Sequence, residues 1–188
     1  MPGKKVVVGI TGASGSILAV RLLKELRDEE IHLVMSDNSK KVIKFETGMD
    51  PSELESRADF VYQDSDVGAR VSSGSFIFDA YVIVPCSIST LSKIAAGISD
   101  SLITRVASVA LKERRRFVIV PRETPLSSIT LENMLKLSVN GVLVLPFMPG
   151  FYTKPRSVDD MVNFVISRLL DAIGVENKIS SRWEGLDE

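Results

Sequence analysis

The chain alternates short apolar runs with segments of helical periodicity, and this alternation constrains its fold more than any other feature. The runs have the length of buried strands and span residues 4–10, 31–35, 80–85, 117–121 and 142–146. Parallel strands that are covered by helices on both faces read as continuous apolar runs of this kind. We therefore predict one α/β domain over residues 1–175, built on a doubly wound parallel sheet, and a tail over residues 176–188.

Helical periodicity fills most of the chain between these runs. The predicted helices cover residues 17–26, 39–45, 91–96, 100–111, 127–138 and 157–173, with a short helix within 50–57. Residues 58–71 are the least regular part of the chain, and we expect loops there.

Composition and charge argue against several functional classes. The formal net charge of −1 argues against a general binder of nucleic acid or of anionic membranes. No apolar run approaches the length of a membrane span, and the apolar part of the N-terminal segment is too short for a signal peptide, so we expect a cytoplasmic protein. Cys86 is the single cysteine and His32 the single histidine, so we expect neither a disulfide framework nor a metal site, and we expect His32 to be structural.

A turn rich in glycine and serine follows the first apolar run. Its sequence over residues 11–16 is Thr-Gly-Ala-Ser-Gly-Ser, and the segment after it has helical spacing. Glycines let a backbone approach an anion closely and the amides of a helix N-terminus point toward it, so this arrangement indicates a phosphate site. The hydroxyls of Ser14 and Ser16 are candidate ligands as well. The glycine spacing differs from the usual dinucleotide fingerprint, which leaves a plain turn without a ligand as the alternative.

Hydroxyl side chains follow the third apolar run, at the start of the next predicted helix. They belong to Ser87, Ser89 and Thr90. One such residue suffices as a helix N-cap, which contributes about 1 kcal/mol. Capping alone remains the alternative, but the number of hydroxyls favours the binding of an anion or a ring.

Two charged residues follow the fourth apolar run. Arg122 and Glu123 lie between two prolines, and the alternative to a binding role is a surface ion pair. In open α/β sheets ligands collect at the carboxyl ends of the strands, so we expect the polar turns to meet at one edge. Their hydroxyls, amides and charges suit a ligand with a phosphate and a polarisable ring. The further cations Arg105, Lys112 and Arg168 would suit a second phosphate.

Several segments resemble the UbiX-type flavin prenyltransferases, once described as aromatic-acid decarboxylases. These segments are 9–15 (GITGASG), 73–76 (SGSF), 85–91 (PCSISTL), 111–115 (LKERR), 121–126 (PRETPL), 131–137 (LENMLKL) and 149–152 (PGFY). The resemblance extends over essentially the whole chain. It implies a flavodoxin-like α/β domain that binds FMN and transfers a dimethylallyl group to N5 and C6 of the reduced flavin. The product would be the prenylated FMN that partner decarboxylases of the UbiD type use.

The resemblance also implies roles for individual residues, position by position. The implied FMN contacts are Gly12, Ala13, Ser14, Ser36, Ser87, Ile88, Ser89, Thr90, Arg105 and Arg122. The implied contacts to the dimethylallyl phosphate are Lys112, Arg122, Glu123, Tyr152, Arg168 and Trp183. Glu46 matches the catalytic glutamate, which would help to protonate the leaving phosphate and handle N5.

Oligomeric state and partners are implied in the same way. Members of the family assemble as dodecamers and place the segment around Trp183 near the site of a neighbouring subunit. The donor would be dimethylallyl monophosphate or pyrophosphate, between which the sequence does not choose, and the monophosphate is our expectation. Relatives often carry a histidine where this chain has Thr153 and Lys154. The alternatives left open are an FMN carrier without catalysis and a flavin-dependent decarboxylase.

Overall fold

A parallel sheet of six strands lies at the centre of the computed structural model, which describes residues 3–183 and 185. The strands are β1 (Lys5–Ile10), β2 (Glu30–Met35), β3 (Phe60–Gln63), β4 (Ala80–Cys86), β5 (Arg116–Pro121) and β6 (Leu143–Val144). They lie in the order β3-β2-β1-β4-β5-β6, and every neighbouring pair is parallel. The chain winds outward from β1 to one edge and from β4 to the other, so the predicted doubly wound α/β fold is confirmed.

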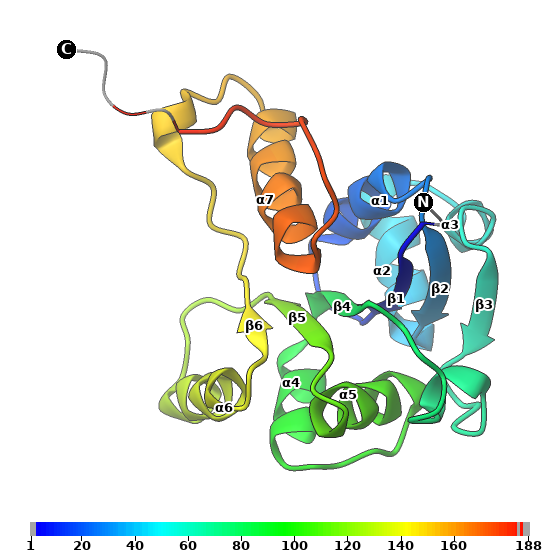
Figure 1. Ribbon diagram of the computed structural model, residues 1–188. Coiled ribbons are helices and arrows are strands. Elements are labelled where there is room, and N and C mark those ends of the chain that lie inside the picture. The colour runs from blue at the N-terminus through cyan, green and yellow to red at the C-terminus, as the bar shows by residue number, and fades with distance from the viewer. Residues whose placement is uncertain (1–2, 184, 186–188) are drawn as a thin grey trace.

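Helices cover both faces of this sheet (Figure 1). They are α1 (Ser16–Glu25), α2 (Asp37–Thr47), α3 (Pro51–Glu55), α4 (Ile88–Ala95), α5 (Leu102–Lys112), α6 (Ser128–Val139) and α7 (Val158–Ile173), with single 3-10 turns η1 (Arg70–Ser72) and η2 (Phe151–Thr153). Apolar residues of α1, α2, α3 and α7 form the core on one face, and those of α4, α5 and one turn of α6 form the core on the other. None of the described helices is both long enough and apolar enough to cross a membrane.

The burial of β1 explains why the apolar runs are continuous. Val6, Val8 and Ile10 pack in the core that contains α1 and α7, whereas Val7 packs in the core on the opposite face. All four side chains are fully buried. A strand covered on both faces has no position for a polar side chain, which accounts for the valine-rich sequence.

Serine N-caps determine where several helices begin. Ser36 accepts a hydrogen bond from the Ser39 amide at 3.2 Å, so α2 begins at Asp37 rather than at the predicted residue 39. Ser87 accepts one from the Thr90 amide at 3.2 Å, so α4 begins at Ile88, earlier than the predicted 91. The N-cap hydroxyl binds an amide that would otherwise lack a partner within the helix.

The two edge strands differ from the sequence prediction. The expectation of loops throughout residues 58–71 is wrong, because β3 pairs with β2 there. His32 on β2 is buried, hydrogen-bonded to Tyr62 at 2.9 Å and stacked on Phe60 with ring centroids 4.7 Å apart. At the other edge β6 is only two residues long, within the predicted strand 142–146. Both strands pair on one side only, and such short or half-exposed edge strands carry a weak apolar signal.

Candidate active site

The polar turns after β1, β4 and β5 meet at the carboxyl edge of the sheet. The Thr11 amide and hydroxyl donate to the Pro85 carbonyl at 3.2 and 2.9 Å, and the Ser87 amide donates to Thr11 Oγ1 at 2.7 Å. The Arg122 amide donates to the Cys86 carbonyl at 3.3 Å. These hydrogen bonds join the three turns in one structure, as predicted.

The turn after β1 also packs closely against the start of α2. The Ser36 amide donates to the Ile10 carbonyl at 3.0 Å, which holds the N-cap of α2 beside the turn. A Cβ atom added at Gly12 would lie 2.6 Å from Cβ of Asn38. Glycine at position 12 is therefore needed for this close approach of the turn to the first turn of α2, the helix that Ser36 caps.

The N-terminus of α1 binds the Glu46 carboxylate. Oε2 of Glu46 accepts from the Gly15 amide at 3.0 Å and from the Ser16 amide at 2.8 Å, and Oε1 lies 3.3 Å from the Gly15 amide. Gly15 has a φ of 103°, which a residue with a side chain rarely adopts, and this conformation turns its amide toward the carboxylate. The amides at the start of α1 therefore point toward a negative charge, which is the property that a phosphate site needs.

The same contacts affect the protonation of Glu46. Partial burial raises its pKa, but hydrogen bonding to the Ser14 hydroxyl and to the Ser16 and Gly15 amides outweighs burial and leaves the pKa below the usual value. Glu46 is therefore a carboxylate at neutral pH while it lies on α1. It has to leave the α1 amides or gain a proton from a reacting group before it can act as an acid.

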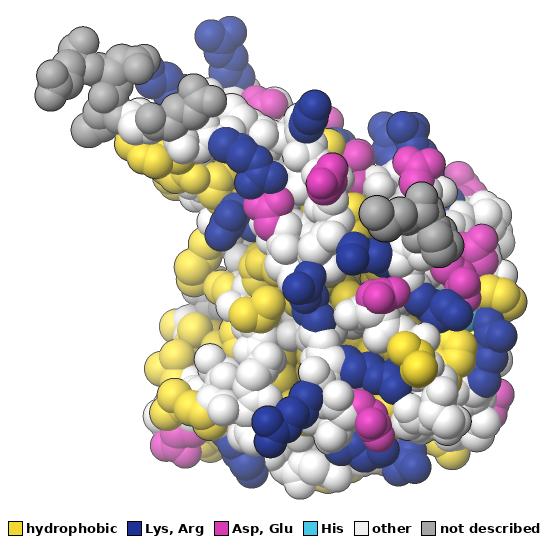
Figure 2. Space-filling view, in the orientation of Figure 1, with side chains coloured by type: hydrophobic (Ala, Val, Ile, Leu, Met, Phe, Trp, Pro, Cys, Tyr) yellow, Lys and Arg dark blue, Asp and Glu magenta, His cyan; other side chains and the backbone are white. Residues whose placement is uncertain are grey.

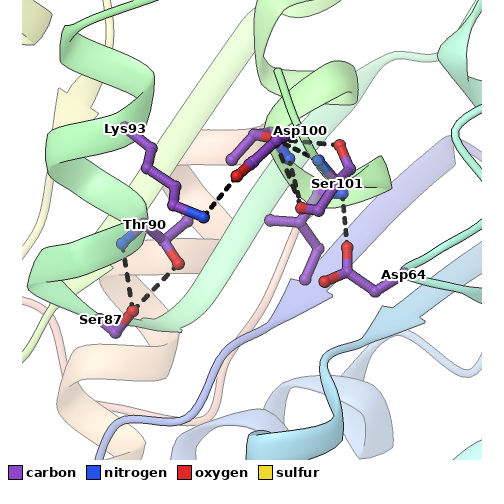
Figure 3. A network of polar contacts seen from close by, with 8 residues as sticks. Asp64, Ser87, Thr90, Lys93, Asp100 and Ser101 are labelled. Atoms are coloured by element: carbon purple, nitrogen blue, oxygen red, sulfur yellow. Dashed lines mark hydrogen bonds and ion pairs between the residues drawn. The ribbon is translucent and has the colours of Figure 1, made fainter. Parts of the chain in front are cut away.

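Hydroxyl groups at the start of α4 cap the helix. Ser87 Oγ lies 3.0 Å from Thr90 Oγ1 in addition to its contact with the Thr90 amide, as Figure 3 shows. The neighbouring network in that view fixes the start of α5, where Asp64 Oδ1 accepts from the Ile103 amide at 2.9 Å and Lys93 pairs with Asp100 at 2.7 Å. The Ser87 and Thr90 hydroxyls thus cap α4 at the same edge of the sheet.

Ser89 differs from these two residues in the first turn of α4. It is exposed, and the hydrogen bonds found among the described residues do not include its hydroxyl. Its hydroxyl therefore remains available to a ligand at the carboxyl edge of the sheet.

A mostly apolar cavity of about 250 Å³ lies between α1, the end of β5 and the start of α7; we call it the edge cavity. Its polar side chains belong to Ser14 and Arg122. The rest of its wall consists of Gly15, Ile17, Leu18, Pro85, Val120, Pro121, Phe147, Val158 and Val162. Ligand sites typically combine such an apolar wall with a few polar groups that orient the ligand.

The charged pair after β5 is not a surface ion pair. Glu123 accepts a hydrogen bond from the Thr124 amide at 3.0 Å, and the ion pairs formed among the described residues include neither Arg122 nor Glu123. Arg122 is exposed at the mouth of the edge cavity, so its guanidinium group can bind an anion there.

A second cavity, of about 460 Å³, brings together three of the predicted substrate contacts; we call it the Tyr152 cavity. Tyr152, Arg168 and Trp183 line it. The Tyr152 ring meets the Trp183 ring edge to face at 5.2 Å and the Phe164 ring at 5.8 Å. An aromatic wall beside an arginine suits a ligand with an apolar part and an anionic part.

The remaining predicted cations lie elsewhere in the subunit. Arg105 and Lys112 are exposed on one face of α5, and Lys112 pairs with Glu113 beside it. Lys112 lies near the start of β5, whereas Arg122 follows its end, and a strand of this length separates the two ends by about 20 Å. Within one subunit Lys112 and Arg122 therefore cannot bind the same phosphate.

Some residues of the two cavities carry no signal in the sequence. Phe147 reaches the edge cavity from the segment after β6, and Asp171 lines the Tyr152 cavity from the exposed side of α7. An apolar residue near a strand end and an acid on an exposed helix face are both common, so only the folded chain reveals their position. No group of three or more His, Cys, Asp or Glu side chains that could hold a metal ion occurs within residues 3–183 and 185.

Sequence and structure comparisons identify the family of this chain. The family model described as Flavoprotein matches residues 1–170. A flavin prenyltransferase UbiX from Thermoplasma acidophilum is 59% identical over 179 residues, which cover 95% of this chain and 99% of the relative. This chain belongs to the UbiX-type flavin prenyltransferases. The family membership that the sequence motifs predict is thereby confirmed.

The similarity of this flavin prenyltransferase to its relatives extends to the fold, as two solved structures show. A UbiX crystal structure in complex with FMN and dimethylallyl pyrophosphate superposes with a TM-score of 0.96 at 43% identity, covering 98% of this chain and 100% of the other. A dodecameric FMN-dependent UbiX-like decarboxylase from Escherichia coli O157:H7 superposes with a TM-score of 0.94 at 48% identity, covering 96% and 100%. The predicted flavodoxin-like fold is confirmed along the chain.

Proposed function

We propose that this chain transfers a dimethylallyl group from dimethylallyl monophosphate to N5 and C6 of reduced FMN. The reaction breaks the carbon–oxygen bond of the donor, forms the bond to N5 with loss of the N5 proton, and releases inorganic phosphate. The bond to C6 forms at one carbon of the donor's double bond, and the other carbon of that double bond takes up the proton that C6 loses. The observation that carries the proposal is the edge cavity, where an apolar wall, Arg122 and the amides of α1 lie together. The UbiX structure with both FMN and dimethylallyl pyrophosphate supports it.

The residues around the edge cavity fit a phosphorylated ring. Gly12 in the turn after β1 packs against Asn38 of α2, and the Ser36 amide at the start of that helix donates to the Ile10 carbonyl just before the turn. We propose that this turn and Ser36 hold FMN together with Ser87, Ile88, Ser89, Thr90, Arg105 and Arg122. Bound in its reduced form, FMN would supply the electron-rich ring atoms to which the new bonds form.

Arg122 and Glu46 have the properties that release of a phosphate requires. A guanidinium group that is already in position stabilises the charge that develops on the leaving phosphate. The Glu46 carboxylate lies on the N-terminal amides of α1, within reach of the same edge. We propose that a bound phosphate takes the place of Glu46 at these amides, and that Glu46 then accepts the proton from N5 of the flavin and gives it to the leaving phosphate.

The apolar wall of the edge cavity excludes water from the reacting carbon. Ile17, Leu18 and Val120 belong to that wall. A dimethylallyl group that loses phosphate is reactive toward water, so a dry cavity favours its transfer to the flavin. This requirement also distinguishes the proposal from a simple FMN carrier, for which no such cavity beside the flavin is needed.

We propose that the complete site forms between subunits of a homododecamer. Lys112, Tyr152, Glu123, Arg168 and Trp183 would bind the dimethylallyl phosphate, but within one subunit Lys112 lies about 20 Å from the edge cavity. Neighbouring subunits therefore have to supply part of this set. The dodecameric relative from Escherichia coli supports this assembly.

Exposed apolar side chains on α6 and the segment after β6 support the same assembly. Ile129, Leu135 and Val139 of α6 are 69%, 64% and 73% exposed, and Met148 and Phe151 are similarly exposed. Figure 2 shows hydrophobic side chains gathered on this side of the molecule. Apolar surface of this extent on an otherwise polar protein marks an interface, and a second copy of the chain fits it.

The proposal extends to the fate of the product and the place of the reaction. We propose that prenylated FMN passes to a UbiD-type decarboxylase and that the protein works in the cytoplasm. The single cysteine, Cys86, is buried and reduced, which suits that compartment. We keep residues 1–175 as the flavin-binding domain and residues 176–188 as the tail.

The mass of the flavin tests the proposal. The purified protein is incubated without oxygen with reduced FMN and dimethylallyl monophosphate or pyrophosphate, and the extracted flavin is weighed. We expect a flavin heavier by one five-carbon unit, and loss of this product by at least about a hundredfold in Glu46→Gln, the range that a lost general acid costs. Glu55→Gln, which removes a half-buried partner of Lys40, serves as the control and should retain activity. Unmodified FMN from a protein that binds it tightly would contradict the proposal and support the carrier.

A further inference from the structure

Residues 176–183, the continuously described part of the C-terminal tail, fold back along α7 to the Tyr152 cavity. Figure 1 shows this segment running beside α7 toward the turn after β6. Its apolar anchors are few: Val175 is buried, and Ile179 is packed against the core that contains α7. Burial alone therefore gives the tail little stability in this position, and its polar contacts become decisive.

Asp171 is the centre of these polar contacts. Its Oδ1 accepts from Arg182 Nη2 at 2.8 Å and from Asn177 Nδ2 at 3.1 Å, and its Oδ2 accepts from Arg182 Nη1 at 3.1 Å. The contact with Arg182 is a two-point ion pair, which fixes orientation as well as distance. It joins α7 to the residue directly before Trp183.

Asn177 adds a second attachment near the beginning of the tail. Its Oδ1 accepts from the Ser167 hydroxyl at 2.7 Å, and its Nδ2 donates to the Ser167 carbonyl at 3.3 Å. Ser167 is almost completely buried in α7. Asn177 and Arg182 therefore attach both ends of the segment 177–182 to the same helix.

The tail in this position forms a wall of the Tyr152 cavity. Ser180, Ser181, Arg182 and Trp183 line it from the tail, opposite Tyr152 and Arg168. Without the docked tail, the edge-to-face contact between Trp183 and Tyr152 is lost and the cavity is open on that side.

Asp171 also contacts Arg168, a proposed phosphate ligand. Arg168 Nη1 lies 3.4 Å from Asp171 Oδ2, and the Arg168 side chain remains 62% exposed, so its other donors are free for a ligand. Two guanidinium groups and one carboxylate leave a net positive charge beside the cavity, which favours an anionic ligand.

We propose that Asp171 is a positioning residue that holds Arg168 and the tail together as the binding site for the phosphate and dimethylallyl group of the donor. The proposal rests on the proposed function. Asn177 and Arg182 have a positioning role as well, because they keep the tail docked and neither acts on the reacting atoms.

Limited proteolysis tests the docking of the tail. Trypsin cleaves after Lys178 and Arg182, and Trp183 is the only tryptophan in the chain, so mass spectrometry and fluorescence quenching both report on the tail. We expect dimethylallyl monophosphate to slow cleavage after Lys178 in the unaltered protein. In Asp171→Asn we expect cleavage about tenfold faster, Trp183 more accessible to acrylamide, and no protection by the donor. A tenfold change corresponds to about 1.4 kcal/mol.

The control is Asp159→Asn, the same substitution on the same helix. Asp159 pairs with Arg21 at 3.2 Å, far from the tail along α7. The Asp159→Asn variant should be cleaved at the same rate as the unaltered protein, and the donor should protect its tail to the same extent. Arg182→Gln, which alters the tail and leaves α7 intact, should behave like Asp171→Asn.

Kinetics separates a positioning role from a general loss of stability. We expect Asp171→Asn to raise the KM for dimethylallyl monophosphate about tenfold. The affinity for FMN and the kcat should stay within about twofold of those of the unaltered protein, because Asp171 does not line the edge cavity and is not among the residues proposed to bind FMN. Asp171→Glu should recover most of the difference.

Three results would overturn the proposal. The first is an Asp171→Asn variant whose KM for the donor and whose tail protection are unchanged. The second is an Asp171→Asn variant that loses FMN affinity and thermal stability as much as it loses affinity for the donor. The third is an unaltered protein whose tail the donor does not protect. A protein that makes no prenylated flavin, but whose tail is protected by the donor in an Asp171-dependent way, would refute the proposed function and leave the assignment of Asp171 intact.

Discussion

At the scale of single residues, the structure separates roles that the sequence leaves together. The hydroxyls of Ser87 and Thr90 are used in capping α4, whereas Glu46 and Arg122 have side chains directed to the carboxyl edge. The sequence shows which polar residues follow each strand, and because the carboxyl ends of parallel strands lie at one edge of the sheet, it also predicts that these residues lie near one another. It cannot predict that the Glu46 carboxylate lies on the amides of Gly15, since that contact joins two helices far apart in the chain.

Gly12 provides a test at this scale. We expect Gly12→Ala to destabilise the protein by about 1–3 kcal/mol, the usual cost of overpacking, because the new methyl group would lie 2.6 Å from Cβ of Asn38. Urea unfolding measures the loss, and FMN titration should show weaker binding because the turn and Ser36 move apart. Gly68→Ala, whose added Cβ meets only Oδ1 of Asp66 at 3.5 Å, is the matched control. Equal losses at both glycines would contradict this account.

At the scale of elements, the buried segments follow the sequence and the edges do not. The strands β1, β2, β4 and β5 lie where the apolar runs predict them, because both of their faces are covered. The edge strand β3 has half-exposed side chains and lies where the sequence predicts a loop, and the short β6 pairs at two positions only. Edge strands depend on a single neighbour, so their sequences are less constrained than those of central strands.

The contact between α1 and α2 has a predictable pH dependence. Burial raises the pKa of Glu46, but hydrogen bonds from the Ser14 hydroxyl and from the Ser16 and Gly15 amides leave this pKa below its usual value in the folded protein. The Glu46 carboxylate therefore stabilises the fold above the usual glutamate pKa of about 4.3, and this contribution is lost as the pH falls through the folded value. Because Glu46 is largely exposed, we expect its carboxylate to contribute no more than about 1 kcal/mol to the free energy of unfolding.

Urea unfolding at several pH values measures this contribution as the difference between the unaltered protein and Glu46→Gln. The difference should be full at pH 7 and should shrink as the pH falls below about 4. Glu176→Gln is the control for the substitution itself, because Glu176 is exposed and its side chain forms no hydrogen bond or ion pair among the described residues. A pH dependence of equal size in that control would refute the role of the α1 amides.

At the scale of the whole molecule, the proposed site is incomplete in a single subunit. Glu46 and Arg122 lie at the carboxyl edge of the sheet, whereas Lys112 lies at the opposite edge and the Tyr152 cavity at the end of α7. Motifs in the sequence predict these residues but not their separation, because a motif carries no information about which subunit a residue serves. The exposed apolar residues of α6 indicate where a second subunit packs.

Mixing of subunits tests most directly whether dimethylallyl transfer takes place at a site shared between subunits. Glu46→Gln and Lys112→Met are each expected to abolish formation of prenylated FMN. The two proteins are dissociated, mixed and reassembled, and the flavin made by the mixture is weighed and compared with that of each variant treated alone. Because Glu46 and Lys112 lie at opposite edges of one subunit, we predict that the mixed oligomer regains a substantial part of the activity, through sites that combine the intact residue of each subunit. A mixed oligomer as inactive as the separate variants would contradict the shared site.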